Sequence, residues 1–270
     1  MLSSKKALQN ASKCAAHASL MADLSKASAQ AQPTSFHKLL RALLCSGILG
    51  RVYTQNIDNL ELKAGLTTMG EEPNCVQLHG SVMKVHCTHC SFNEHTCHHF
   101  SALSEGRLPT CPRCEAWIKQ RKSEGKRVAS KSGLLRPAII LYGESHPNAD
   151  HIAAMQALDI CQVDNLLVVG TSLKTFGSVH LIKEISAALR GAEKGRAYYL
   201  DLEQPPTSQA GLFDQILQAD CQDLAKEMLN QLGTSDQGHS ASFFEVGADL
   251  ADCVEAGRVR EDMRPSWDWA

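Results

Sequence analysis

The chain has 270 residues, of which 43% are hydrophobic and 21% are charged, and its formal net charge is −2. These values fit a water-soluble globular protein with one large domain and a small module, and they speak against attraction of the whole chain to nucleic acid or an anionic membrane. No apolar stretch approaches the ~20 residues of a membrane span, and no apolar signal-peptide core follows Lys5 and Lys6. We therefore expect an intracellular, reducing environment, in which cysteines bind metal or lie buried as free thiols.

Two helices, a short strand and a polar loop are predicted in the first 58 residues. Residues 1–32 are rich in Ala, Ser, Lys and Gln, and their apolar positions recur at helical spacing, at Leu20, Met21 and Leu24. Residues 36–49 predict a second helix that ends before Gly50. Residues 51–54 predict a short strand, which leads into the loop Gln55-Asn56-Ile57-Asp58.

Two cysteine pairs, Cys87-x-x-Cys90 and Cys111-x-x-Cys114, form the most specific pattern in the chain. Each C-x-x-C turn supplies two thiolates, and a tetrahedral zinc ion takes four. The separation of the pairs fits the structural-zinc pattern, and Pro112 stiffens the second turn. Chance clustering among 11 cysteines is the alternative. Because four sulfur ligands leave no open position, the pattern predicts one structural zinc per chain.

The zinc motif lies in a segment, residues 86–134, that we interpret as an inserted module. A basic run over 119–131 reads as a solvated linker, with a nuclear-import or histone-facing patch as the alternative. Because four thiolates complete the metal shell, the histidines of this segment are expected to face solvent; they are His86, His89, His95, His98 and His99. The cysteines outside the motif are expected to be small buried residues, namely Cys14, Cys45, Cys75, Cys161, Cys221 and Cys253.

From residue 138 onward, apolar strands alternate with helices. The predicted strands are 138–142, 165–169 and 197–202, and the predicted helices are 149–158, a stripe at Ile182, Ile185 and Leu189, and 212–232. Such alternation predicts a Rossmann-like α/β fold, a parallel sheet with helices on both faces. Polar turns after the strands then meet at one edge, where such sheets bind ligands. One of them, 170–172, is expected to begin a helix whose N–H groups face an anion, with simple helix capping as the alternative.

In order along the chain, these motifs resemble the sirtuin (Sir2) family of NAD-dependent protein deacylases. Thr54-Gln55-Asn56-Ile57-Asp58 is similar to the family's nicotinamide-binding motif, and Leu78-His79-Gly80 to its catalytic-histidine motif. Tyr142-Gly143-Glu144 resembles the strand beside the acyl-lysine peptide. Gly170-Thr171-Ser172-Leu173 is similar to the ribose and phosphate loop, and Asp220-Cys221 to the adenine-side motif.

The resemblance implies NAD as co-substrate and His79 as the catalytic base, because histidine suits proton transfer near neutral pH. The implied NAD-binding residues are Gln55, Asn56, Asp58, Gly170, Thr171, Ser172, Asp201 and Cys221. The implied peptide-binding residues are Tyr142, Gly143 and Glu144, and Cys87, Cys90, Cys111 and Cys114 hold zinc. Ordinary turn chemistry is the alternative for the histidine, asparagine and aspartate.

The implied architecture is a Rossmann-like NAD-binding domain over 1–85 and 135–232, a zinc module over 86–134 and a tail over 233–270. Residues 135–147 most resemble the fungal nuclear branch, whose members deacetylate a lysine in the core of histone H3. The implied partner is therefore acetylated histone H3 in the nucleus, with no direct binding to nucleic acid or membrane.

The sequence also departs from the family pattern. No glycine precedes Gly47, so the family's Gly-Ala-Gly loop beneath the pyrophosphate is missing, as is its Pro-Asp-Phe-Arg segment; Asp201 stands where Asn is usual. We expect a sequence truncated at its front edge that binds NAD poorly, with an exposed sheet edge and low solubility or a rearranged first helix. A catalytically impaired, peptide-binding module is thus the alternative function. A zinc-ribbon nucleic-acid binder is a third, disfavoured by the acidic balance.

Overall fold

The computed structural model describes residues 10–68, 73–128, 131–192 and 195–234. The chain forms two compact units, the first built from residues 1–33 and 51–149 and the second from 34–50 and 150–270. Of the predicted tail over 233–270, only residues 233 and 234 belong to the described part of the chain. Cys253 lies outside it. Within the described part of the chain, no helix combines the length and apolarity needed to cross a membrane.

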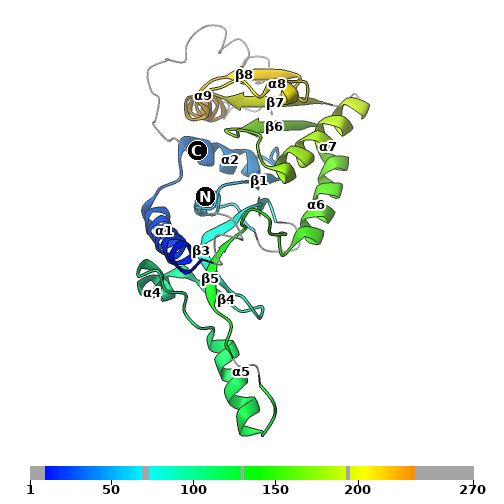
Figure 1. Ribbon diagram of the computed structural model, residues 1–270. Helices are drawn as coiled ribbons and strands as arrows, with labels where there is room; N and C mark the ends of the chain where they lie inside the picture. Colours follow the sequence, from blue (N-terminus) through cyan, green and yellow to red (C-terminus); the bar gives the residue numbers. More distant parts are fainter. Residues whose placement is uncertain (1–9, 69–72, 129–130, 193–194, 235–270) are drawn as a thin grey trace. The chain divides into compact units, whose positions relative to one another are not determined.

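The first unit combines one long helix with two small sheets (Figure 1). Strands β1 and β2 pair in parallel, whereas β3 lies between β4 and β5 and is antiparallel to both. In this unit the helices are α1 (Ala11–Gln30), α3 (Leu60–Lys63), η2 (Thr96–His99), α4 (Phe100–Ser104) and α5 (Pro112–Ser123). The strands are β1 (Val52–Thr54), β2 (Cys75–Gln77), β3 (Gly80–Cys87), β4 (Asn93–His95) and β5 (Leu135–Ile139).

Helix α1 closes the core of the first unit against β3 and α4. Asn10 caps the helix, its side-chain oxygen accepting the backbone N–H of Lys13 at 3.2 Å. Ala18 and Ala22 lie one turn apart and are fully buried, so the helix approaches the sheet closely. Their cluster contains Val85, Cys87, Leu103, Cys111 and Leu135. Two of the four zinc-motif cysteines are therefore part of a packed core.

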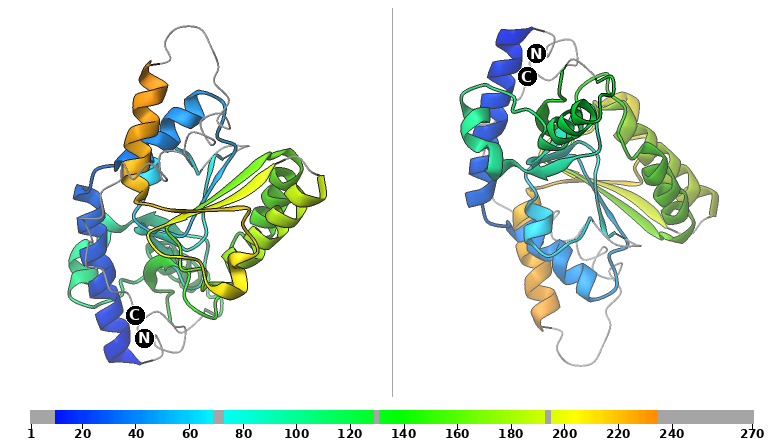
Figure 2. Two further views of the ribbon diagram at one scale, coloured as in Figure 1. Left: turned by 90° about the horizontal axis from the view of Figure 1, so that it is seen from above. Right: turned by 90° about the horizontal axis from the view of Figure 1, so that it is seen from below.

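The second unit is a three-stranded parallel sheet in the order β6-β7-β8 with helices around it. Its strands are β6 (Asn165–Val169), β7 (Arg196–Asp201) and β8 (Gln215–Gln218). Its helices are α2 (Ser35–Cys45), α6 (Ala149–Gln162), α7 (Phe176–Ala192), α8 (Thr207–Ala210) and α9 (Cys221–Thr234). Helices α2 and α9, far apart in the sequence, lie side by side in both views of Figure 2.

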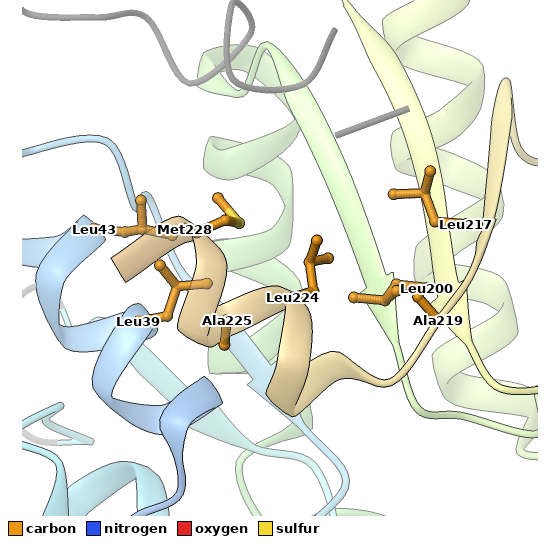
Figure 3. Packing of buried hydrophobic residues seen from close by; sticks show 8 residues of the cluster. All are labelled: Leu39, Leu43, Leu200, Leu217, Ala219, Leu224, Ala225 and Met228. Atoms are coloured by element: carbon orange, nitrogen blue, oxygen red, sulfur yellow. The ribbon is translucent and has the colours of Figure 1, made fainter. Parts of the chain in front are cut away.

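Both faces of this sheet are covered by helices. Successive side chains of β7 point to opposite faces, so neighbouring residues of this strand pack on different sides. Tyr199 packs on one face with Ile182 of α7. Leu200 packs on the other face, where α2 and α9 bring Leu39, Leu43, Leu224, Ala225 and Met228 against it (Figure 3). The predicted stripe Ile182, Ile185 and Leu189 is buried along α7.

The predicted α/β fold with parallel strands is confirmed, with four corrections. The mostly helical segment predicted over 212–232 is helical from residue 221 onward, as α9, but residues 215–218 form strand β8. Strand β5 pairs antiparallel with β3 rather than joining a parallel sheet. Helix α7 begins at Phe176, so residues 170–172 form a loop and not a helix start. Cysteines 45 and 161 are exposed, whereas Cys75 is buried as predicted; Cys14 and Cys221 are half-buried.

Candidate active site and metal centre

The four cysteines of the two C-x-x-C pairs converge on one point. The sulfur of Cys87 lies 3.7 Å from that of Cys114, and the sulfur of Cys90 lies 3.7 Å from that of Cys111. All four sulfur atoms lie within 4.8 Å of one another. Four thiolates around a tetrahedral zinc, each ~2.3 Å from it, would stand about 3.8 Å apart. The donor set therefore fits a structural Zn²⁺, and the distances are too long for disulfides.

Backbone groups around Cys87 favour the thiolate form of this residue, which a metal requires. The N–H groups of His89 and Cys90 point at the Cys87 sulfur at 3.3 and 3.4 Å. Burial raises the pKa of the Cys87 thiol. The hydrogen bonds from these donors and from the neighbouring cysteines outweigh burial and lower the pKa to about 7. Gly133, which the sequence analysis missed, leaves room for the site, since a Cβ there would lie 2.4 Å from the Cys87 sulfur.

The histidines of this segment have partners other than the four thiols. His98 and His99 both contact the carboxylate of Glu94 at 2.8 Å, and the Thr88 hydroxyl lies 2.9 Å from His89. His89, His95 and His98 are exposed as predicted, whereas His86 and His99 are half-buried. Within the described residues, the cysteine cluster is the one group of His, Cys, Asp and Glu whose ligand atoms converge.

His79 lies in the tight connection between β2 and β3. The carbonyl oxygen of His79 accepts the Ile140 N–H at 3.0 Å, and the preceding Leu78 N–H donates to Thr54 at 2.9 Å. Gly80 adopts a φ of +81°, and a Cβ at this residue would lie 2.0 Å from the Ala138 carbonyl oxygen. Only glycine fits here, so the Gly after the histidine fixes the path of the His79 backbone.

The polar loop after β1 is anchored by a buried carboxylate. Glu61 is 3% exposed, and its Oε1 accepts the Thr54 hydroxyl at 2.5 Å. The Thr54 hydroxyl oxygen in turn accepts the Asn56 backbone N–H at 3.1 Å. The Asn56 side chain is exposed. Asp58, half-buried like Gln55, accepts the N–H of Leu60, the first residue of α3, at 3.1 Å. The loop is therefore fixed through its backbone.

A hydrogen-bond network that the sequence analysis missed joins this loop to both sides of His79. Asn59 has a left-handed backbone, with a φ of 64°. Its side-chain oxygen accepts from Gln77 at 2.7 Å, before the histidine, and from the Ser81 hydroxyl at 2.6 Å, after it. The one available signal was an Asn next to the recognised loop, because Asn tolerates this conformation. The network holds the Gln55–Asp58 loop and the His79 connection together.

A second missed residue, His146, lies beside this connection. Its Nε2 donates to the Gln77 carbonyl at 3.3 Å, and its Nδ1 accepts the Asn148 N–H at 3.0 Å, which defines a neutral tautomer. Burial lowers the pKa of His146; the bond to Gln77 opposes this shift, and the proximity of His79 adds to it. His146 follows the predicted peptide-binding residues by two positions, which was the available signal.

The predicted peptide-binding residues form a turn after β5. Tyr142 is 64% exposed, and Gly143 has a φ of +84°, with no atom of the described residues within 4 Å of its Cβ position. Glu144 differs from both, because its side chain points inward and forms an ion pair with Arg136 at 2.8 Å, each side chain being 15% exposed. Burial raises the pKa of Glu144, but the bonds from Arg136 and the Leu141 N–H outweigh it and leave the pKa below its usual value.

The remaining predicted residues belong to the second unit and follow its strands. After β6, Gly170 has a φ of +58° and Thr171 accepts the Tyr199 hydroxyl at 2.9 Å, while Ser172 is exposed. Burial and the nearby carboxylate of Asp201 raise the pKa of Tyr199 to about 12, so this phenol stays a donor. Leu173, only 2% exposed, has a φ of 55°, a conformation that tertiary packing must enforce in a leucine.

Two more predicted residues lie at the ends of β7 and β8. Asp201 ends β7, and its side chain accepts the Glu203 N–H at 3.2 Å. Cys221 begins α9 next to Asp220, whose side chain accepts the Gln222 N–H at 2.6 Å. Burial, with the carboxylate of Asp220, raises the pKa of the Cys221 thiol. The second unit thus brings Gly170–Ser172, Asp201 and Cys221 to the carboxyl ends of its parallel strands, where such sheets bind ligands.

Comparison with known proteins identifies the family. Residues 2–177 match the Sir2 family, and the NAD-dependent histone deacetylase HST3 of Saccharomyces cerevisiae is 35% identical over 252 residues, or 87% of this chain. The chain belongs to the Sir2 family. The NAD-dependent protein deacetylase hst4 of Schizosaccharomyces pombe is 35% identical over 200 residues, or 71% of this chain. The predicted membership of the sirtuins is therefore confirmed.

Solved structures of this family share the fold. A Sir2 homolog–NAD complex has a TM-score of 0.64 at 22% identity, covering 87% of this chain and 77% of that chain. A mutant Sir2 homologue with ADP-ribose also has a TM-score of 0.64, at 20% identity, with 88% and 81% covered. This chain covers 54% of the HST3 deacetylase and 47% of the hst4 deacetylase, so it spans about half the length of these curated relatives.

Proposed function

We propose that this Sir2-family chain is an NAD-dependent protein-lysine deacetylase whose substrate is acetylated histone H3 in the nucleus. One observation carries the proposal. In the first unit, the His79 connection is bonded on one side to Thr54, at the start of the polar loop, and on the other to Ile140, just before the Tyr142 turn. The proposed base, the proposed amide-binding loop and the proposed peptide-binding turn thus belong to one hydrogen-bonded framework. The relatives named as NAD-dependent histone deacetylases add support for the reaction and for the histone substrate.

The residues have distinct roles in this proposal. Asn56 and Asp58 hold the nicotinamide carboxamide, because an Asn side chain both donates and accepts while Asp accepts from the amide. We assign Gln55 and the Gly170–Ser172 loop to the ribose and phosphate of NAD, and Asp201 and Cys221 to its adenosine. Tyr142 and Gly143 pair with the extended acetyl-lysine peptide. Zinc, held by the four cysteines, keeps the module folded and takes no part in the reaction.

The proposed chemistry needs one base. The acetyl oxygen attacks the ribose carbon that bears nicotinamide, and the carbon–nitrogen bond to nicotinamide breaks. His79 then takes a proton from a ribose hydroxyl, whose oxygen attacks the acetyl carbon. Addition of water and departure of the lysine amine leave O-acetyl-ADP-ribose. The products are nicotinamide, free lysine and O-acetyl-ADP-ribose, which together account for NAD, acetyl-lysine and one water.

A second candidate function is a peptide-binding module that turns over NAD slowly or not at all. A specific sequence feature favours it, because residues 1–46 contain no glycine and so do not themselves encode a glycine turn of the kind that approaches a pyrophosphate closely. The two candidates share the Tyr142 turn and the zinc module. They differ in NAD binding and in the need for His79.

Nicotinamide release with an acetylated histone H3 peptide and NAD separates the two candidates. Because weak NAD binding is expected from the sequence, the assay uses NAD in excess. We then expect release by the wild-type chain and loss of at least about 100-fold in His79→Ala, since general-base catalysis contributes roughly 10²–10⁴-fold. His98→Ala, which removes a 58% exposed surface histidine, is the matched control and should keep full activity. Equal rates for wild type and His79→Ala would refute the assignment. Calorimetric titrations measure NAD binding and peptide binding separately. Peptide binding without measurable NAD binding would favour the second candidate.

A further inference from the structure

The turn after β5 is a closed reverse turn. The Glu144 N–H donates to the Leu141 carbonyl oxygen at 2.9 Å, and Gly143 at the third position has a φ of +84°. This is the arrangement of a type II turn, which needs a positive φ at that position. The turn points the exposed Tyr142 side chain outward and buries Leu141, which is 2% exposed. Its conformation therefore sets where Tyr142 lies.

The Glu144 carboxylate closes this turn from inside. Its Oε2 accepts the Leu141 N–H at 3.1 Å and the Arg136 Nη2 at 2.8 Å. Both charged side chains are mostly buried, so neither charge can be left unpaired without a large penalty. A carboxylate that is already bound to a guanidinium and a backbone N–H is not presented to a ligand. The geometry assigns it to holding the turn.

Arg136 also reaches a second element. Its Nε donates to the Nε2 of His86 at 2.7 Å, and these residues face each other across the β3–β5 pair. His86 directly precedes the zinc ligand Cys87. One guanidinium thus joins the strand that carries a metal ligand, strand β5 and the turn beyond it. Lysine could not replace it, because only the planar fork bonds two partners in this way.

We infer that Arg136 and Glu144 are positioning residues, which lock the turn Leu141–Glu144 in the conformation that receives the acetyl-lysine peptide. This inference rests on the proposed function. Glu144 itself does not contact the peptide, and its effect passes through Tyr142 and Gly143. Breaking the ion pair therefore weakens peptide binding and leaves NAD binding intact.

The test combines a conformational readout with a binding readout. Glu144→Gln and Arg136→Lys are compared with Glu105→Gln, which removes a charge from the exposed pair formed by Glu105 and Arg107. Hydrogen exchange reports opening of the turn at the Leu141 and Glu144 amides, and fluorescence anisotropy gives the affinity for a labelled acetyl-lysine peptide. In both test variants we expect exchange at least about tenfold faster and a peptide Kd about tenfold weaker, with metal content, NAD affinity and the exposed-pair control unchanged.

Two results would overturn the inference. One is unchanged exchange at the turn in Glu144→Gln and Arg136→Lys, and the other is faster exchange with an unchanged peptide Kd. If Glu144→Gln unfolds as a whole, exchange in α1 accelerates as well, and Arg136→Lys, which keeps the positive charge, decides the question. Failure of the proposed function looks different, because the wild type would then bind peptide and show a closed turn without consuming NAD.

Discussion

Replacing Gly80 by Ala should displace the His79 connection at a cost that the structure allows us to calculate. The added methyl carbon would lie 2.0 Å from the Ala138 carbonyl oxygen and 3.0 Å from its carbonyl carbon, which are backbone atoms that cannot rotate away. The left-handed conformation costs a non-glycine residue about 1–2 kcal/mol. Crowding in a packed site adds about 1–3 kcal/mol. We therefore expect Gly80→Ala to lower the free energy of unfolding by about 2–5 kcal/mol.

Gly125→Ala separates the two contributions. Gly125 belongs to the same unit and has a similar φ of +68°, but among the described residues no atom lies within 4 Å of its Cβ position. This control should lose only the conformational part, about 1–2 kcal/mol. Urea titration measures both variants, provided that the slope of free energy against urea is unchanged. Equal losses in the two variants would refute the contact between Gly80 and the Ala138 carbonyl.

Three further outcomes are expected. Metal analysis should find about one zinc per wild-type chain and almost none in Cys111→Ser, because three thiolates do not complete the shell; full zinc in the variant would contradict the four-cysteine site. Tyr199→Phe, which loses the 2.9 Å bond to Thr171, should unfold with about 1 kcal/mol less free energy in urea, and unchanged stability would count against that bond. The lowered pKa of Glu144 means that its ion pair is complete above the usual carboxyl pKa of ~4.3 and is lost as pH falls further. Below about pH 4.3, the free energy of unfolding should therefore fall more in the wild type than in Glu144→Gln. Parallel pH profiles of the two proteins would show that the ion pair does not contribute to the acid loss of stability.

The sequence predicted those elements whose pattern is local. Strand β6 has the predicted bounds 165–169, because a short apolar run between polar residues leaves few alternatives. The zinc cluster was equally local, since each C-x-x-C turn presets one pair of ligands. The register of His86 opposite Arg136 was not predictable, because these residues are 50 positions apart and no local pattern connects them.

Tertiary contacts override local preference where prediction failed. Residues 215–218 resemble the helical sequence around them, yet they form β8 because Leu217 packs against the core beside Leu200 while the strand pairs with β7. Cys45 and Cys161 show that burial of a free cysteine is only a tendency, and not a property of each residue.

The candidate site was predicted by motif but not by its supports. Resemblance supplied His79 and the polar loop, whereas the Asn59 network and the Arg136–Glu144 pair depend on contacts that only the folded chain creates. Such supports act through two or three distant partners at once. A linear sequence does not display those combinations, even when each residue type in them is ordinary.

The central claim is that the acetyl group passes to a ribose hydroxyl deprotonated by His79. Mass spectrometry of a single-turnover reaction with NAD and an acetylated histone H3 peptide tests this directly. The account predicts O-acetyl-ADP-ribose in the same amount as the free lysine peptide, and its absence from the His79→Ala reaction. Free acetate as the product, with NAD left intact, would contradict the account.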